Sequence, residues 1–171
     1  MAYTDIDKPS DYFNTSAVWS GDDSEHTISG IEHQPDFTWI KGVNIGTQHY
    51  LFDSVRGATK ILISNGTNAE FTVAQTLKSW NSDGFVLGTS DDVNGSGRTY
   101  VSWNWKESAT AGFDILTYEG SGSAQTISHN LGVKPDVIIV KNIDSSDPPF
   151  NWRVYHSSLG AGVALKLNAT D

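Results

Sequence analysis

The chain has no cysteine, one methionine and few cations, with 11 Lys and Arg against 20 Asp and Glu in 171 residues. Without cysteine, disulfides, thiolate metal sites and thiol chemistry are excluded. The formal charge of −9 and the scattered Lys and Arg argue against a surface that follows a phosphate backbone, so nucleic acid is not an expected partner. No apolar run reaches the roughly 20 residues of a membrane helix, and the N-terminus is polar. Neither membrane insertion nor a signal peptide is therefore expected.

Aromatic residues and glycine are plentiful, with 6 Trp, 7 Phe, 6 Tyr and 16 Gly. Short runs rich in β-branched and aromatic residues recur between Gly, Asn, Asp and Ser, which is typical of turn-rich antiparallel proteins. No window shows the sustained helical spacing of apolar residues. The pattern predicts an all-β fold, an antiparallel jelly roll or concanavalin-like sandwich of two packed sheets.

Runs of this kind predict individual strands. In the first part of the chain they cover residues 17–20, 27–31, 37–43, 49–54, 59–64, 71–73, 77–80, 84–87 and 98–106. In the second part they cover residues 112–118, 125–128, 137–141, 152–155 and 163–167. The alternation in 98–106 predicts that Trp103 and Trp105, in line with Val101, face the core. Val137–Val140 is apolar on both sides, which predicts a central strand that is covered on both faces.

The sequence also repeats itself. Thr-Ile-Ser and Pro-Asp-x-x-x-x-Lys occur at 27–29 and 35–41 and return at 126–128 and 135–141. Ser-x-x-Gly-Ala at 54–58 returns at 157–161, with a Leu and an Asn following at matching distances. Such self-similarity indicates tandem copies of one structural unit. It predicts a first β-sandwich module with an N-terminal lead over residues 1–107, and an incomplete second copy of the same module over residues 108–171.

The aromatic side chains suggest a site where a sugar ring could stack. Trp80 and Tyr100 are the two candidates for ligand-facing aromatics, because Trp103 and Trp105 are assigned to the core. The acidic stretch 91–97 resembles a calcium loop but has no closing bidentate Glu, and the same residues also suit a hairpin loop between strands 84–87 and 98–106. We therefore expect no metal there.

Signals for catalysis are missing. There is no Gly-x-Ser-x-Gly motif, the glutamates are dispersed along the chain, and the five His show no ligand spacing. No catalytic residue, cofactor or metal ligand is expected, and the sequence is interpreted as that of a protein that is not an enzyme.

Four segments carry a resemblance to a known family: residues 1–13, Gln-Pro-Asp-Phe-Thr-Trp-Ile-Lys at 34–41, Leu-Phe-Asp-Ser-Val-Arg-Gly-Ala-Thr-Lys at 51–60 and Tyr-Val-Ser-Trp-Asn-Trp-Lys at 100–106. They resemble the tandem-module, tail-fibre-like structural proteins of marine bacteriophages, whose modules are concanavalin-like sandwiches. The resemblance implies a non-enzymatic virion structural protein, made in the host cytoplasm and placed in a tail fibre or other appendage used in assembly and host attachment.

The same resemblance implies partners. These are other virion structural proteins and further copies of the chain, with a trimer expected by analogy to fibres. Two alternatives remain open: a capsid decoration or cement protein, and a carbohydrate-binding adhesin module that binds host surface glycans.

Overall fold

The computed structural model describes residues 8–14, 17–144 and 149–170. Up to residue 107 these residues form two short helices and ten strands. The helices are η1 (Pro9–Asp11) and α1 (Asp91–Asn94). The strands are β1 (Phe13–Asn14), β2 (Val18–Ser20), β3 (His26–Ile28), β4 (Phe37–Gly42), β5 (His49–Asp53), β6 (Lys60–Ile63), β7 (Phe71–Thr72), β8 (Leu77–Asn81), β9 (Gly84–Leu87) and β10 (Thr99–Trp105).

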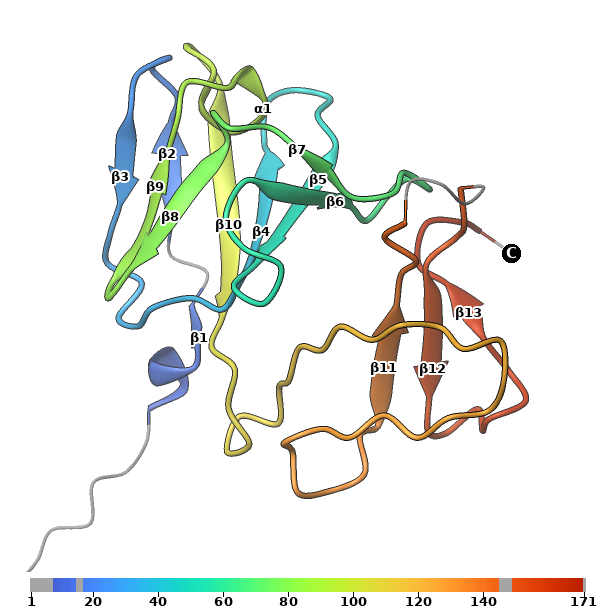
Figure 1. The fold of residues 1–171 in the computed structure, drawn as a ribbon. Coiled ribbons are helices and arrows are strands. Elements are labelled where there is room, and N and C mark those ends of the chain that lie inside the picture. Colours follow the sequence, from blue (N-terminus) through green and yellow to red (C-terminus); the bar gives the residue numbers. More distant parts are fainter. Residues whose placement is uncertain (1–7, 15–16, 145–148, 171) are drawn as a thin grey trace, which may run out of the picture.

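The ten strands form two antiparallel sheets that face each other across one core (Figure 1). In the larger sheet, β1 and β2 both pair with β10, and the order continues through β4, β5, β6 and β7. The smaller sheet has the order β3-β9-β8. Ile40 and Phe52 from the larger sheet and Phe85 and Leu87 from the smaller one are fully buried in the shared core. The predicted all-β sandwich is confirmed.

The inward face of β10 is the opposite of the predicted one. Tyr100, Ser102 and Asn104 are completely buried, whereas Trp103 and Trp105 lie on the other side of the sheet and are partly exposed. Some of the polar groups on this face are satisfied, since Asn104 Nδ2 donates to Ser102 Oγ at 2.9 Å and to the Asn14 carbonyl at 3.2 Å. The prediction that Trp103 and Trp105 face the core is wrong.

Residues 91–97 do not form a hairpin loop. The preceding strand β9 pairs with β3 and β8, whereas the following strand β10 pairs with β1, β2 and β4. The segment therefore crosses from one sheet to the other. It contains α1, whose N-cap is Ser90, with Oγ accepting from the backbone N–H of Asp92 at 3.3 Å.

The segment 51–60, which carries the most specific part of the family resemblance, has a structural role. The Arg56 guanidinium is buried and donates to Asp53 Oδ2 at 2.5 Å, to Glu70 Oε2 at 3.2 Å and to the Leu51 carbonyl at 3.2 Å. The cation thus joins the end of β5 to residues before β7. Removing one member would leave a buried charge without its partner, which explains why these residues occur together.

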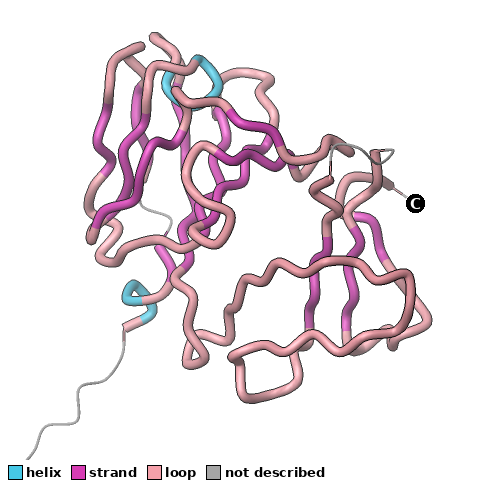
Figure 2. The backbone as a smooth tube through the Cα atoms, in the orientation of Figure 1, coloured by secondary structure: helices cyan, strands magenta, loops and turns pink. Residues whose placement is uncertain are grey.

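Beyond residue 107 the described residues form one small sheet (Figure 2). It contains β11 (Val137–Val140), β12 (Arg153–His156) and β13 (Leu165–Lys166), in that order and antiparallel. The strands predicted at 112–118 and 125–128 do not form, and these segments are loop (Figure 2). Trp152 joins this part to the larger sheet, because its ring packs against Leu51 and Leu62 and its Nε1 donates to the Ile63 carbonyl at 2.9 Å.

The repeated sequences adopt the same pairings. We call residues 8–107 the first copy and residues 108–170 the second copy, with β11, β12 and β13 equivalent to β4, β5 and β6. The registers correspond: Thr38–Phe52 with Ile138–Tyr155, Leu51–Leu62 with Val154–Leu165, and Tyr50–Ile63 with Arg153–Lys166. The division of the chain at residue 107 remains a prediction, but the three-stranded unit is repeated in space as well as in sequence.

β11 is an edge strand of its sheet, not a central one. Its only pairing partner among the described residues is β12. Val137, Ile138 and Ile139 are 49%, 43% and 52% exposed. The prediction of a strand covered on both faces is wrong, because the described part of the second copy contains no equivalent of β10 or of the smaller sheet.

Candidate functional site

Tyr100 is a core residue and not a ligand-facing aromatic. It is completely buried on β10 and stacks on Trp19, with 5.7 Å between ring centroids. Its hydroxyl donates to the Asp91 carbonyl at 2.6 Å and accepts from the Gly95 N–H at 3.0 Å. Because ring and hydroxyl are both occupied by the protein, the prediction that Tyr100 faces a ligand is wrong.

Trp80 lies in the smaller sheet, on β8, and is half-buried. Its ring packs against the core, and Nε1 lies 3.4 Å from Thr38 Oγ1 on β4. It therefore links the two sheets, and it does not form a shared surface with Tyr100. That its exposed part faces a ligand remains a prediction.

The acidic stretch 91–97 is held by protein contacts. Asp91 Oδ2 pairs with Arg98 Nη2 at 2.9 Å, and Asp92 Oδ1 accepts from the Tyr50 hydroxyl at 2.6 Å. Burial and this hydrogen bond raise the pKa of Tyr50. Within residues 8–14, 17–144 and 149–170, no group of three or more His, Cys, Asp or Glu side chains is placed to hold a metal ion.

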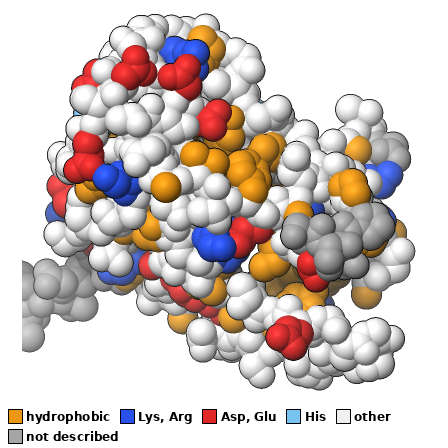
Figure 3. Space-filling view, turned by 45° about the horizontal axis from the view of Figure 1, so that its top comes forward, with side chains coloured by type: hydrophobic (Ala, Val, Ile, Leu, Met, Phe, Trp, Pro, Cys, Tyr) orange, Lys and Arg blue, Asp and Glu red, His pale blue; other side chains and the backbone are white. Residues whose placement is uncertain are grey.

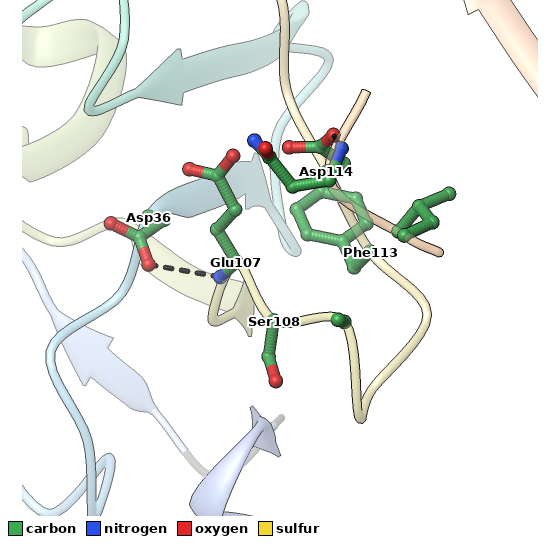
Figure 4. Close-up of a pocket in the computed structure, with 8 residues that line it drawn as sticks. Asp36, Glu107, Ser108, Phe113 and Asp114 are labelled. Atoms are coloured by element: carbon green, nitrogen blue, oxygen red, sulfur yellow. Dashed lines mark hydrogen bonds between the residues drawn. The ribbon is translucent and has the colours of Figure 1, made fainter. Parts of the chain in front are cut away.

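A cavity of about 320 Å³ lies where β10 leads into the second copy (Figure 4). The carboxyl groups of Asp36, Glu107 and Asp114 lie around it, and Asp36 Oδ2 accepts from the Glu107 N–H at 2.9 Å. A hydrogen bond between Glu107 and Asp114 raises the pKa of Glu107 and lowers that of Asp114. Asp114 Oδ1 is buried and has no hydrogen-bond partner among the described residues. The arrangement fastens the start of the second copy to the first.

Aromatic rings cover the outer face of the larger sheet. Phe13, Trp105, Phe37 and Phe113 follow one another with ring centroids 4.8 to 5.9 Å apart. Trp103 and Trp39 form a further edge-on pair, at 6.0 Å. Aromatic pairs at these distances attract one another beyond the effect of burial alone. An aromatic surface therefore lies on this face, and it includes Trp103 and Trp105, which the sequence had predicted in the core.

A second cavity, of about 340 Å³, lies between the two copies at the Trp39 end of this aromatic face. The loop that follows β6 and the loop that follows β13 are equivalent in the repeat, and both line it. The residues with polar groups around it are Trp39, His49, Ser64, Asn65, Asn168 and Thr170. Neither copy forms this cavity alone.

Two equivalent asparagines are fixed in the same way in the two loops. Asn65 Oδ1 accepts from the His49 N–H at 3.0 Å, and Asn168 Oδ1 accepts from the Trp152 N–H at 2.9 Å. Asn65 Nδ2 donates to Gln48 Oε1 at 2.7 Å, and Asn168 Nδ2 makes the matching bond to Asn151. The two amides are therefore held in defined orientations at the cavity.

His49 is neutral in this setting. Its Nδ1 accepts a hydrogen bond from Trp39 Nε1 at 3.1 Å. Burial, and to a lesser degree the charge of Lys41, lower the pKa of His49. Sequence reasoning missed His49, Asn65 and Asn168, although the Asn repeated at the same place in both copies was a signal that could have found two of them.

The chain belongs to the family described as Domain of unknown function (DUF7483), whose model matches residues 8–171. The match extends over both copies. Neither the curated proteins nor the solved structures contain a match to the chain. In the part of the chain that the structure describes, no helix is long and apolar enough to span a membrane.

Proposed function

We propose that the chain is a non-enzymatic structural protein of a phage virion, a tandem-module part of a tail fibre or other appendage used in assembly and host attachment. The observation that carries the proposal is the repeat, in which the same three-stranded unit recurs with the same register. Units that contact mainly their neighbours can be joined in series, as a long appendage requires. The family resemblance of segments such as 51–60 points in the same direction.

A hydrogen bond between an Asp and a Ser side chain, present in both copies, supports this proposal. Asp36 Oδ1 accepts from Ser54 Oγ at 2.9 Å, and Asp136 Oδ1 accepts from Ser157 Oγ at 2.6 Å. These bonds join the residue before β4 to the end of β5, and the residue before β11 to the end of β12. The recurrence of one internal shape in two successive copies suits a component whose task is mechanical.

The edge of β11 that no described strand pairs with supports assembly. In the first copy the equivalent strand β4 has β10 on its free side, paired over six residues. An apolar strand with an open edge offers its backbone N–H and C=O groups to another strand. Hydrophobic side chains also reach the surface of both copies (Figure 3). A strand from a neighbouring subunit beside β11 would complete the pairing that the first copy makes internally, and a homo-oligomer is expected.

Immunogold labelling of intact phage particles tests the proposal. Label on the tail or its fibres is the expected result. Regular label over the head would replace the appendage by the capsid decoration alternative, and particles without label would overturn the virion assignment. Labelling of a virion mixed with purified chain serves as the control for adsorption.

A further inference from the structure

We propose that the cavity between the two copies is a binding site for a neutral saccharide, with Trp39 as its aromatic wall and Asn65 and Asn168 as its hydrogen-bonding amides. The inference goes beyond the structural function and does not depend on it, because the cavity exists in the isolated chain. Its volume, about 340 Å³, lies within the range of small-molecule sites. Its position between two units is also one where such sites are frequent.

The lining determines the charge of the ligand. The described residues around the cavity include indole, imidazole, amide and hydroxyl groups and the apolar Leu167 and Ala169, but no carboxylate, ammonium or guanidinium group. An ionic ligand would lose its hydration there without gaining an opposite charge. The site therefore suits an uncharged molecule.

Trp39 and His49 form one polar and aromatic wall. Trp39 is partly exposed at the cavity, and its ring contacts that of Trp103 edge-on. Its indole N–H is used by His49 Nδ1, at 3.1 Å, so the indole offers a ligand its apolar surface. Since Nδ1 of the neutral imidazole accepts, the proton lies on Nε2, which adds a hydrogen-bond donor.

The two asparagines supply directed hydrogen bonds. Each uses one lone pair of Oδ1 and one N–H of Nδ2 within the protein, so each keeps a second acceptor site and a second donor. Because these internal bonds fix the amides, little freedom is lost when a ligand binds. The hydroxyls of Ser64 and Thr170 add groups that both donate and accept.

This combination matches a sugar ring. A pyranose has an apolar face of C–H groups that packs on an aromatic ring, and a rim of hydroxyls that both donate and accept. Amides and hydroxyls can satisfy such a rim, because each of these groups carries both donors and acceptors. A purely apolar ligand would leave the amides without partners, which costs free energy.

The first experiment is an NMR titration of the full 171-residue chain. D-glucose, D-galactose, D-mannose and N-acetyl-D-glucosamine are added separately while the indole N–H signals are observed. The signal of Trp39 is expected to move with at least one sugar, with millimolar affinity, as is usual for so small a ligand. The signal of Trp19, which is buried in the core of the first copy, is the internal control. No movement of the Trp39 signal with any of the four sugars overturns the proposal.

Variants then test the site. Asn168→Asp keeps the acceptor for the Trp152 N–H but places a charge at the cavity, and at least tenfold weaker binding is expected. Asn81→Asp is the matched control, since Asn81 lies on β8 in the smaller sheet and its Oδ1 likewise accepts a backbone N–H. If Asn168→Asp perturbs the fold, Ser64→Ala, which removes only a hydroxyl, is expected to weaken binding severalfold. Unchanged affinity in a folded variant, or tighter binding of D-glucuronate than of D-glucose, contradicts the assignment.

Discussion

Strands β4 and β11 occupy the same place in the repeat but differ in their surroundings. Both follow Pro-Asp, and Lys41 within β4 is equivalent to Lys141 directly after β11. β4 lies between β10 and β5, and its Thr38 and Ile40 are completely buried. Among the described residues β11 has only β12 beside it, and three of its four residues are exposed although its composition is the more apolar. Burial therefore depends on which other strands are present and not on the hydrophobicity of the strand itself.

The local contacts are nevertheless the same in both copies. The hydrogen bond between Asp36 and Ser54 recurs between Asp136 and Ser157; we call it the Asp–Ser clamp. The bond that the Asn65 side chain accepts from a backbone N–H recurs at Asn168; we call it the Asn clamp. These contacts need only a turn and two adjacent strands, so they form wherever the short sequence recurs. The two-sheet core, in contrast, needs strands that lie far apart in the chain.

The largest expected effect comes from separating the copies. Residues 8–107 expressed alone should unfold in one cooperative thermal transition, because they contain both sheets of the sandwich. Residues 108–171 alone should show no such transition, because three short strands bury too little apolar surface. Circular dichroism during heating measures both. Cooperative unfolding of the second fragment would contradict the interpretation that its sheet depends on other strands.

Substitution of the equivalent residues Phe52 and Tyr155 should give unequal losses of stability. Phe52 is completely buried, so Phe52→Ala in the full chain should cost about 3–5 kcal/mol. Tyr155 is only half-buried on β12, and Tyr155→Ala should cost less than about 1.5 kcal/mol. Urea unfolding with a common slope compares the two. Equal midpoints would mean that the second sheet is covered as well as the first.

Substitution of the equivalent residues Asn65 and Asn168 should, in contrast, give similar losses. Each substitution by Ala removes one bond to a backbone N–H and one to a side-chain oxygen. A destabilisation of about 1 kcal/mol is expected for each. It is measured in the same urea experiment. A loss confined to Asn65→Ala would show that the second clamp contributes nothing to the folded chain.

The smallest effect concerns pH and the position where the first copy has His49 and the second has Trp152. The pKa of His49 is lowered in the folded chain, so the unfolded chain binds a proton more readily. This histidine therefore contributes a loss of stability as the pH falls below about 6.5, its value in an unfolded chain. The melting temperature of the native chain should drop more between pH 7.5 and 5.5 than that of His49→Gln. An equal drop would show that His49 is not perturbed.

The alternation and turn residues predicted the strands of the first copy well. Those predicted at 37–43, 49–54, 59–64, 77–80 and 84–87 occur as β4, β5, β6, β8 and β9, with ends within about two residues. Local spacing was sufficient here because each of these strands has one face in a core. The same reasoning failed at 112–118 and 125–128, where the described part of the chain supplies no neighbouring strand to pair with.

Which face of β10 is buried could not be predicted from the alternation of its residues. The pattern shows two faces but not which one is buried, and the face with Trp103 and Trp105 has the larger apolar surface. The structure buries Tyr100, Ser102 and Asn104. The Tyr100 hydroxyl donates to the Asp91 carbonyl, and Asn104 Nδ2 donates to the Asn14 carbonyl, so these partners come from outside β10. Because Tyr100 is buried, the candidate site lies at Trp39 and the loops around it and not at Tyr100.

The sequence by itself determined the strand-rich composition, the repeat and the short-range clamps, because these depend on residues close together in the chain. Only the tertiary structure decided which faces are buried, that β11 lies at the edge of the sheet among the described residues, and that two equivalent loops meet at one cavity. The reason is physical: desolvation and strand pairing depend on which distant segments arrive at a surface, and no local pattern contains that information.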